Sequence, residues 1–144
     1  MNDLQTRSYD PKQVIMTFGG ITVTGYISGT FIEVEKEDGF KEDVGADGTE
    51  NRTNTNKTGA NLKVSIQQQS LTNDQFSAVH EADIKSNTGK APLTIKDGNG
   101  TTLVYSKQAY IKNYAKINYG ESATGREWNF RLPNVGILVG GNLV

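Results

Sequence analysis

The sequence lacks cysteine entirely and contains one histidine and one tryptophan among its 144 residues. Without cysteine the chain forms no disulfides and no thiolate metal sites, and it offers no thiol nucleophile. The single histidine, His80, can make neither a histidine-based metal cluster nor an acid/base pair with a second histidine, so we expect it to be structural. These absences exclude cysteine-based redox chemistry and the common zinc sites.

The chain also lacks an excess of either charge and any long apolar run. Its formal net charge is −1, and its basic residues are scattered. Tight binding of nucleic acid draws on clustered cations that neutralise phosphates, so we expect none. No apolar run approaches the roughly 18 residues of a membrane span, and the first ten residues contain no apolar signal region. We therefore expect a protein that is made in a cytoplasm, stays soluble and does not insert into a membrane.

Catalytic patterns are weak. Glu33 and Glu35 lie two residues apart on one predicted strand, so both point the same way, whereas paired glycosidase carboxylates flank their substrate. No Gly-x-Ser-x-Gly motif occurs. One acidic group resembles a calcium loop but lacks its ligand spacing; it comprises Asp38, Glu42, Asp43, Asp47 and Glu50. We predict no catalytic residue, no metal site and no cofactor, and hence no enzyme.

Apolar and polar residues alternate along much of the chain, as in half-buried strands. The pattern predicts a single domain over residues 1–144 that is mainly β. It is an antiparallel β-sandwich or barrel with one short amphipathic helix and a long projecting loop. Gly19-Gly20 predicts a bend or bulge, and Asp97 to Gly100, whose residues tolerate positive φ, predicts a tight hairpin. The expected strands cover residues 14–18, 21–24, 30–36, 60–69, 93–96, 101–107, 115–119, 128–132 and 135–139.

One segment has the signals of a helix. Thr72 to Gln75 reads as a capping box, in which the Thr72 hydroxyl accepts from the Gln75 amide. Leu71 and Phe76 occupy the two positions of a hydrophobic staple. We predict a helix from about residue 73 to residue 85 that covers one face of a sheet.

A polar stretch over residues 37–59 separates two predicted strands and is longer than an ordinary connection. Phe40 and Val44 are its apolar residues, and the Gly-Ala-Asp-Gly sequence at 45–48 can fold it back as a hairpin. The stretch is therefore predicted to be a projecting arm that meets a partner. The alternative is a mobile surface loop with two incidental apolar residues.

Taken in order, these segments resemble a known family. The residues that carry the resemblance are Phe31 to Glu35, Phe40 to Gly48, Gly59 to Gln67, Ser70 to Asp74 and Trp128 to Phe130. Together they resemble the tail tube proteins of contractile-tailed bacteriophages, whose fold is shared with the inner tube of type VI secretion. The resemblance extends from Tyr9 onward, and residues 1–8 carry no part of it.

The resemblance implies a structural virion protein that is made in the host cytoplasm and assembles with itself. Its six-fold rings would stack into the tube inside the sheath and conduct double-stranded DNA without holding it tightly. Tail sheath, terminator and baseplate proteins would be its other partners. The arm would supply the contact between rings or subunits through Phe40, Val44, Gly45, Asp47 and Gly48.

Successive side chains of a strand point to opposite faces of the sheet, and this alternation assigns the residues of two strands to the core or to the channel. Leu62, Val64 and Ile66 are expected to face the subunit core. The residues expected to face the channel, as a mixed and mildly acidic lining, are Glu33, Glu35, Asn61, Lys63, Ser65 and Gln67.

A rival hypothesis is a monomeric β-sandwich binding module of the carbohydrate-binding or adhesin type. Such modules use exposed aromatic rings on one sheet face. The candidates for this platform are Tyr105, Tyr110, Tyr114 and Tyr119. The same tyrosines also suit boundaries between core and interface, where an apolar ring with a polar tip is favoured.

Overall fold

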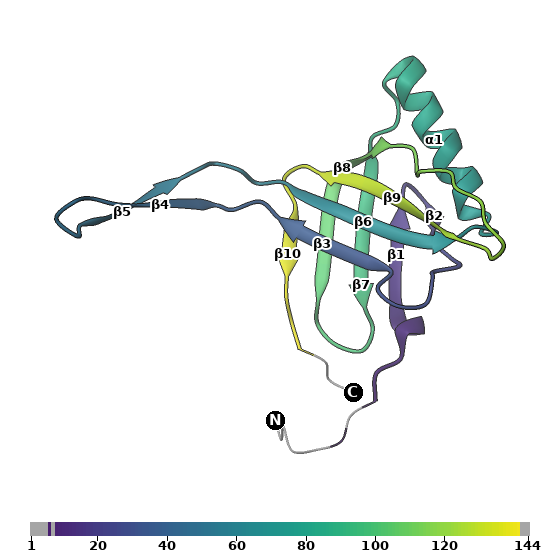
Figure 1. Cartoon of the computed structure of the whole chain (residues 1–144), viewed down its shortest axis with the longest axis horizontal. Coiled ribbons are helices and arrows are strands. Elements are labelled where there is room, and N and C mark those ends of the chain that lie inside the picture. The colour runs from purple at the N-terminus through teal and green to yellow at the C-terminus, as the bar shows by residue number, and fades with distance from the viewer. Residues whose placement is uncertain (1–5, 7, 142–144) are drawn as a thin grey trace.

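A computed structural model describes Thr6 and residues 8–141 of the chain. The protein is mainly antiparallel β-sheet with one α-helix, which confirms the predicted fold class (Figure 1). The main sheet is not closed into a barrel within the described residues. Its two end strands, β2 (Ile21–Thr22) and β3 (Ile32–Lys36), each pair with one neighbour only.

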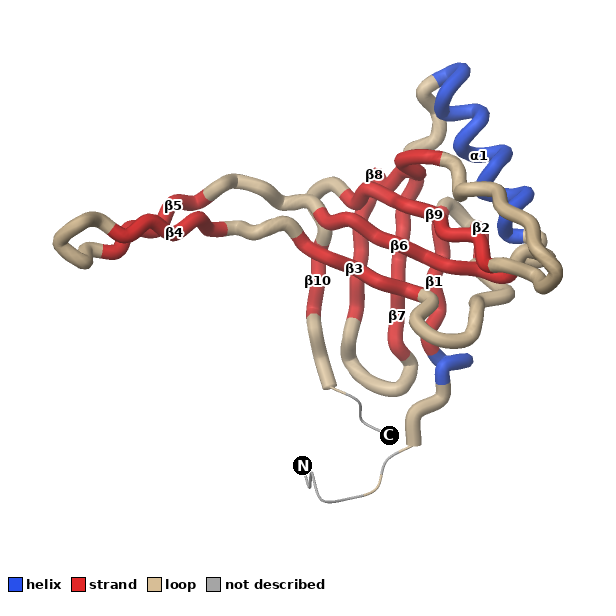
Figure 2. The backbone as a smooth tube through the Cα atoms, viewed as in Figure 1, coloured by secondary structure: helices blue, strands red, loops and turns tan. Residues whose placement is uncertain are grey.

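The main sheet has the strand order β2-β1-β7-β8-β9-β6-β3, and β10 pairs with β8 beside this path. Figure 2 shows that it folds into two layers whose strands cross at a large angle. One layer contains β1, β7 and β10, and the other contains β3, β6 and β9. The remaining strands are β1 (Val14–Phe18), β6 (Ala60–Gln67), β7 (Ala91–Asp97), β8 (Leu103–Asn113), β9 (Gly125–Leu132) and β10 (Gly136–Leu138); a short 3-10 helix covers Pro11–Gln13.

Strand β8 belongs to both layers. Its first half pairs with β7 and β10, and its second half pairs with β9. The register shifts between these halves, because Ser106 lies opposite Leu93 while Ala109 lies opposite Ala91. The extra residue on β8 is a bulge, which bends a strand and increases its twist. This bend turns one continuous sheet into a sandwich.

The core lies between the two layers and follows the predicted parity. Leu62, Val64 and Ile66 are all fully or almost fully buried. The ring of Phe130 packs edge-to-face on Phe18 at 5.1 Å and on Phe76 at 5.2 Å. Phe76 belongs to α1 (Thr72–Ser86), so its ring fixes the helix to the sandwich.

The helix is present, but its predicted start is wrong in detail. No side chain caps it, and Thr72 is its first residue. The Thr72 hydroxyl instead accepts a hydrogen bond from the Thr24 backbone N–H at 3.2 Å, so a tertiary contact replaces the capping box. Leu71 is 76% exposed, and the hydrophobic staple with buried Phe76 does not form.

Two further local predictions are corrected. Residues 115–119 form no strand; Ala115 is buried, whereas Ile117 and Tyr119 are exposed in a loop that follows β8. The hairpin between β7 and β8 is confirmed, but none of its residues 97–100 has a positive φ. Buried Asn99 holds this turn by donating to Asp97 Oδ1 at 3.0 Å. The bend at Gly19-Gly20 is confirmed, with φ angles of 57° and 85°.

Candidate assembly surfaces

The stretch over residues 37–59 forms a hairpin arm. Strands β4 (Phe40–Val44) and β5 (Glu50–Asn54) pair in a two-stranded sheet of their own. This arm projects far from the body of the subunit (Figure 1). The predicted hairpin is therefore confirmed.

The tip of the arm has a defined turn. Gly45 N–H donates to the Thr49 carbonyl at 2.8 Å, and Gly48 has a φ of 86°, which favours glycine. Thr49 N–H donates to Asp47 Oδ1 at 3.0 Å. This hydrogen bond lowers the pKa of Asp47, so its carboxylate is charged at neutral pH.

The arm receives little packing from its own subunit. Every residue from Phe40 to Asn54 is exposed, and the exposed fractions of Phe40 and Val44 are 49% and 63%. The Arg52 guanidinium lies 4.2 Å from the centre of the Phe40 ring and covers part of it. An isolated two-stranded hairpin is only marginally stable in water, so contacts beyond the hairpin itself would stabilise the arm.

The base of the arm is fixed to the sandwich. Glu37 forms an ion pair with Arg131 of β9, and the Thr58 hydroxyl donates to Asn134 Oδ1 at 2.7 Å. Val135 N–H also donates to the Thr58 carbonyl at 3.0 Å. The arm therefore leaves the body at a defined point beside the ends of β9 and β10.

A second surface is the outer face of the β3–β6–β9 layer. Glu33 lies opposite Lys63 and Glu35 opposite Asn61 in the β3–β6 register. Ser65 is half-buried, and the other members of the predicted set are exposed. The strand pairing thus brings the predicted residues to one polar face, formed by Glu33, Glu35, Asn61, Lys63, Ser65 and Gln67.

Sequence reasoning missed part of this face. Glu127, Asn129 and Arg131 of β9 lie opposite Ser65, Lys63 and Asn61. Lys112 of β8 lines the same shallow hollow as Glu33 and Glu35. The alternation of Trp128, Phe130 and Leu132 was a usable signal, since it points the residues between them outward. With these additions the face carries Glu33, Glu35 and Glu127 against Lys63, Lys112 and Arg131. Arg131 is already paired with Glu37 at the base of the arm, so the face has a mixed charge.

The four tyrosines do not form one platform. Tyr114 packs on His80 at 4.6 Å and tilts against Trp128 at 6.3 Å, while Tyr119 lies over the Arg126 guanidinium at 5.4 Å. Tyr105 and Tyr110 lie on β8, opposite Gly136 and Arg131 respectively. Within the described residues no two of the four tyrosine rings contact each other.

His80 is buried beneath Tyr114, a position that fits the predicted structural role. The Tyr114 hydroxyl donates to the Glu81 carboxylate. That bond, with the ammonium of Lys85 at 3.1 Å, lowers the pKa of Glu81, and the same bond raises the pKa of Tyr114. These contacts fasten the end of β8 to the helix.

Residue 6 and residues 8–141 contain no group of three or more His, Asp or Glu side chains that could hold a metal ion. Over the same residues no helix is long and apolar enough to span a membrane. The candidate functional features described above are two surfaces, the arm and the polar sheet face.

No protein family model matches the chain. A curated relative, "Structural protein ORF10" of Pseudomonas phage KPP10, is 33% identical to this chain over a match of 147 residues. The match covers 96% of this chain and 85% of the relative. The chain belongs to the family of this phage structural protein. The expectation of a phage structural protein, reached from the resemblance, is thereby confirmed at the level of the family.

Solved structures share the fold of this phage structural protein. One match is the structure described as the anti-feeding prophage cap (AFP tube terminating cap), with a TM-score of 0.58 and 10% identity over 96% of this chain and 95% of that chain. Another is the sheath/tube terminator of an extracellular contractile injection system (PVC) in the extended state. Its TM-score is 0.56 with 12% identity over 93% of this chain and 99% of that chain.

Proposed function

We propose that this phage structural protein is a ring-forming subunit of a contractile tail, in which six-fold rings stack into the inner tube that conducts DNA. One observation carries the proposal. The subunit presents a polar sheet face beside an arm that projects from the body and receives little packing from it. The fold it shares with contractile injection system structures supports the coarser part of the proposal, a structural role in a contractile tail.

Ring closure has a physical basis in the sheet. The outer edge of β3 has no strand partner within the described residues, and the second half of β8 forms the other border of the β8–β9–β6–β3 surface. An open edge exposes a row of unpaired N–H and C=O groups, which a neighbouring copy can satisfy. In a ring, the β3 edge of one copy meets the β8 side of the next, and the polar faces join into one wall.

This wall would line the channel through Glu33, Glu35, Asn61, Lys63, Ser65 and Gln67. The mixed charge of the face, with Lys63 Nζ 3.5 Å from a Glu127 carboxylate oxygen and Arg131 paired with Glu37, leaves few free cations. Binding to DNA phosphates relies on released counterions and therefore on such cations. DNA would pass this lining without being held.

The arm would then join successive rings through Phe40, Val44 and the turn of Gly45, Asp47 and Gly48. An identical head-to-tail contact repeated along an axis gives an open filament. The protein would reside in the virion, inside a sheath, after synthesis in the host cytoplasm. Sheath, terminator and baseplate proteins would be its further partners.

A tube terminator or cap is the second candidate function. It is favoured by the solved structures, because both of those named above are described as terminating or capping a tube. A terminator forms a single ring that ends a tube, whereas a tube subunit stacks on its own copies. Self-stacking therefore separates the two functions.

The experiment is sedimentation and negative-stain electron microscopy of the purified chain over a wide concentration range. Filaments of stacked rings are the expected result for a tube subunit, and rings that never stack would assign the terminator function. A protein that stays monomeric at every concentration would refute both and favour the monomeric binding module.

A further inference from the structure

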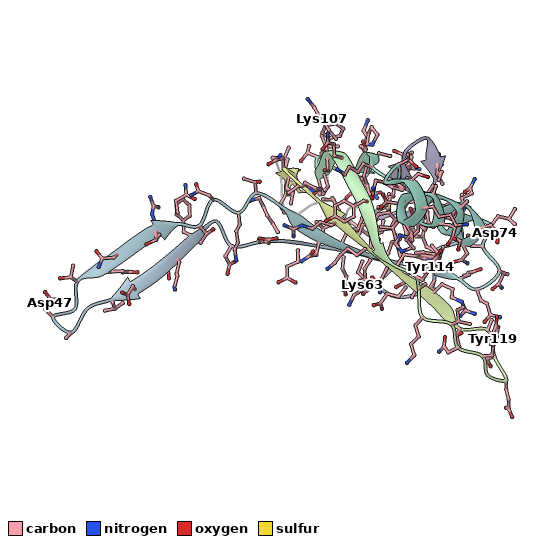
Figure 3. The ribbon with its side chains drawn as sticks, turned by 90° about the horizontal axis from the view of Figure 1, so that it is seen from above. Asp47, Lys63, Asp74, Lys107, Tyr114 and Tyr119 are labelled. Atoms are coloured by element: carbon pink, nitrogen blue, oxygen red, sulfur yellow. The ribbon has the colours of Figure 1, made fainter. Side chains whose placement is uncertain are left out.

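The strands that bear the arm reach a second surface at their other end. The arm continues β3 and β6 at the end where Lys36 pairs with Ala60. At the other end of β6, Gln67 pairs with Gly125, and loops over residues 68–71 and 114–124 follow. Figure 3 shows Tyr119 of these loops at the end of the molecule opposite Asp47 of the arm tip.

A buried cation without an acidic partner lies in this second surface. Arg126 is only 7% exposed. Its Nη1 donates to neutral oxygens, including Thr124 Oγ1 at 3.0 Å and the Asn118 carbonyl at 3.4 Å. No carboxylate of the described residues lies within the 4.0 Å of an ion pair. Buried charges in proteins are normally paired, whereas this guanidinium has no acidic partner among residue 6 and residues 8–141.

The surroundings of Arg126 are open and mixed, because polar Gln68, Asn73 and Ser77 line them together with apolar side chains. The hollow that contains Arg126 has a volume of about 440 Å³ and is also lined by Ile117, Tyr119 and Trp128. A larger hollow of about 670 Å³ lies elsewhere, between the two layers. Ile117 is 70% exposed and Tyr119 is 78% exposed. Asp74 lines the same hollow without forming an ion pair with Arg126. We name Ile117, Tyr119 and Arg126 the loop-end surface.

We propose that the loop-end surface is the receptor for the arm of a second copy in the adjacent ring, an inference that rests on the ring-forming function proposed above. Residues 37–59 contain six acidic and three basic side chains, so an anionic segment meets the unpaired guanidinium. Phe40 and Val44 supply exposed apolar groups that match Ile117 and Tyr119. The two surfaces lie at opposite ends of the same strands, as a head-to-tail contact requires.

The groove between the two layers is the competing receptor. It is lined by aliphatic side chains such as Ile32, Val34 and Ile137, and by Tyr9 at its margin. Its charged lining residues are Lys36 and Asp97, so charge does not exclude it. The groove reaches Lys36 at the strand end that bears the arm, whereas a head-to-tail contact needs the opposite end, so the strand geometry favours the loop-end surface.

Cross-linking distinguishes the two receptors, because the chain contains no native cysteine. An Ala46→Cys protein is mixed with an Ile117→Cys protein, co-assembled, and treated with a short bis-maleimide. A covalent dimer is expected for this pair and is expected to be lost when Tyr9→Cys replaces Ile117→Cys. All three positions are exposed, so the substitutions leave the core intact. Assembled tubes that yield the dimer with Tyr9→Cys, or with neither partner, would overturn this inference while the ring-forming function stands.

A matched pair of variants tests the role of charge. Ile117→Asp and Ile117→Lys both remove the exposed aliphatic side chain, but only the aspartate places a negative charge opposite the acidic arm. Ile117→Asp is expected to lose tubes while single rings persist, and Ile117→Lys is expected to keep tubes. Equal stacking by both variants would overturn the inference. A wild-type protein that never forms rings would overturn it together with the ring-forming function.

Discussion

The Phe40→Ala substitution tests whether the arm supplies the energy of ring stacking. Phe40 is 49% exposed in the isolated subunit, so a contact can still bury about half of its side chain. Full burial of a phenylalanine contributes roughly 1.5–3 kcal/mol, so the remaining half is worth about 1 kcal/mol per contact. In a six-fold ring all the contacts form together, giving about 6 kcal/mol per added ring if they add. Since about 1.4 kcal/mol is a factor of ten, the substitution is expected to weaken ring addition by about 10⁴-fold.

The assay is the concentration of protein that remains in the supernatant after tubes are pelleted, measured for the wild type and for each variant. Lys41→Ala is the matched control, because Lys41 is the exposed neighbour of Phe40 on β4 and points to the other face of the hairpin. The thermal unfolding of the subunit is expected to stay unchanged in both variants. Tubes of Phe40→Ala that form at the wild-type concentration would refute the reasoning, as would a large drop in its unfolding temperature.

Four further predictions follow from the same structure. Replacing residues 37–58 with a short Gly/Ser turn is expected to leave a cooperative unfolding transition but abolish tubes, because changes in loop length cost only about 0.6 kcal/mol per doubling; noncooperative unfolding would show that the arm belongs to the core. Phe76→Ala is expected to cost about 3–5 kcal/mol in urea unfolding, because its ring is fully buried between the helix and the sheet. In Lys63→Cys tubes a small maleimide is expected to react and a protein-linked maleimide to be blocked; equal labelling would show that this face points outward. The Tyr114 hydroxyl lowers the pKa of Glu81. Ionised Glu81 therefore stabilises the fold above the ordinary glutamate pKa, and this stabilisation is lost as the pH falls through the lowered value. In Tyr114→Phe the free energy of unfolding should fall less over that pH range.

The polar and apolar faces of the strands could be predicted from the sequence because strand parity depends only on the order of residues. Leu62, Val64 and Ile66 turned inward as expected, and Glu33 and Lys63 met on the opposite face. The arm could also be predicted, since its length and its Gly-Ala-Asp-Gly turn are local features of the sequence.

Features that depend on distant partners were not predictable. Thr72 has the spacing of a helix cap, yet its hydroxyl bonds to Thr24, which lies 48 residues away in the sequence. Ala115, Ile117 and Tyr119 alternate like a strand, but only Ala115 is buried, because no neighbouring strand pairs with that segment. The unpaired state of Arg126 likewise depends on the packing of loops that no local pattern specifies.

Strand β8 has a mechanical consequence. Its backbone runs unbroken from the layer of β1, β7 and β10, where Leu103 pairs with β7 and β10, into the layer of β3, β6 and β9, where Ile111 pairs with β9. A force applied to one layer is therefore transmitted to the other along covalent bonds and hydrogen-bonded ladders, and not only through contacts between apolar side chains. The two layers cannot shear past each other unless a ladder on β8 breaks. Each subunit would then respond to axial load as a stiff block, and the compliance of an assembly would reside in its hairpin arms.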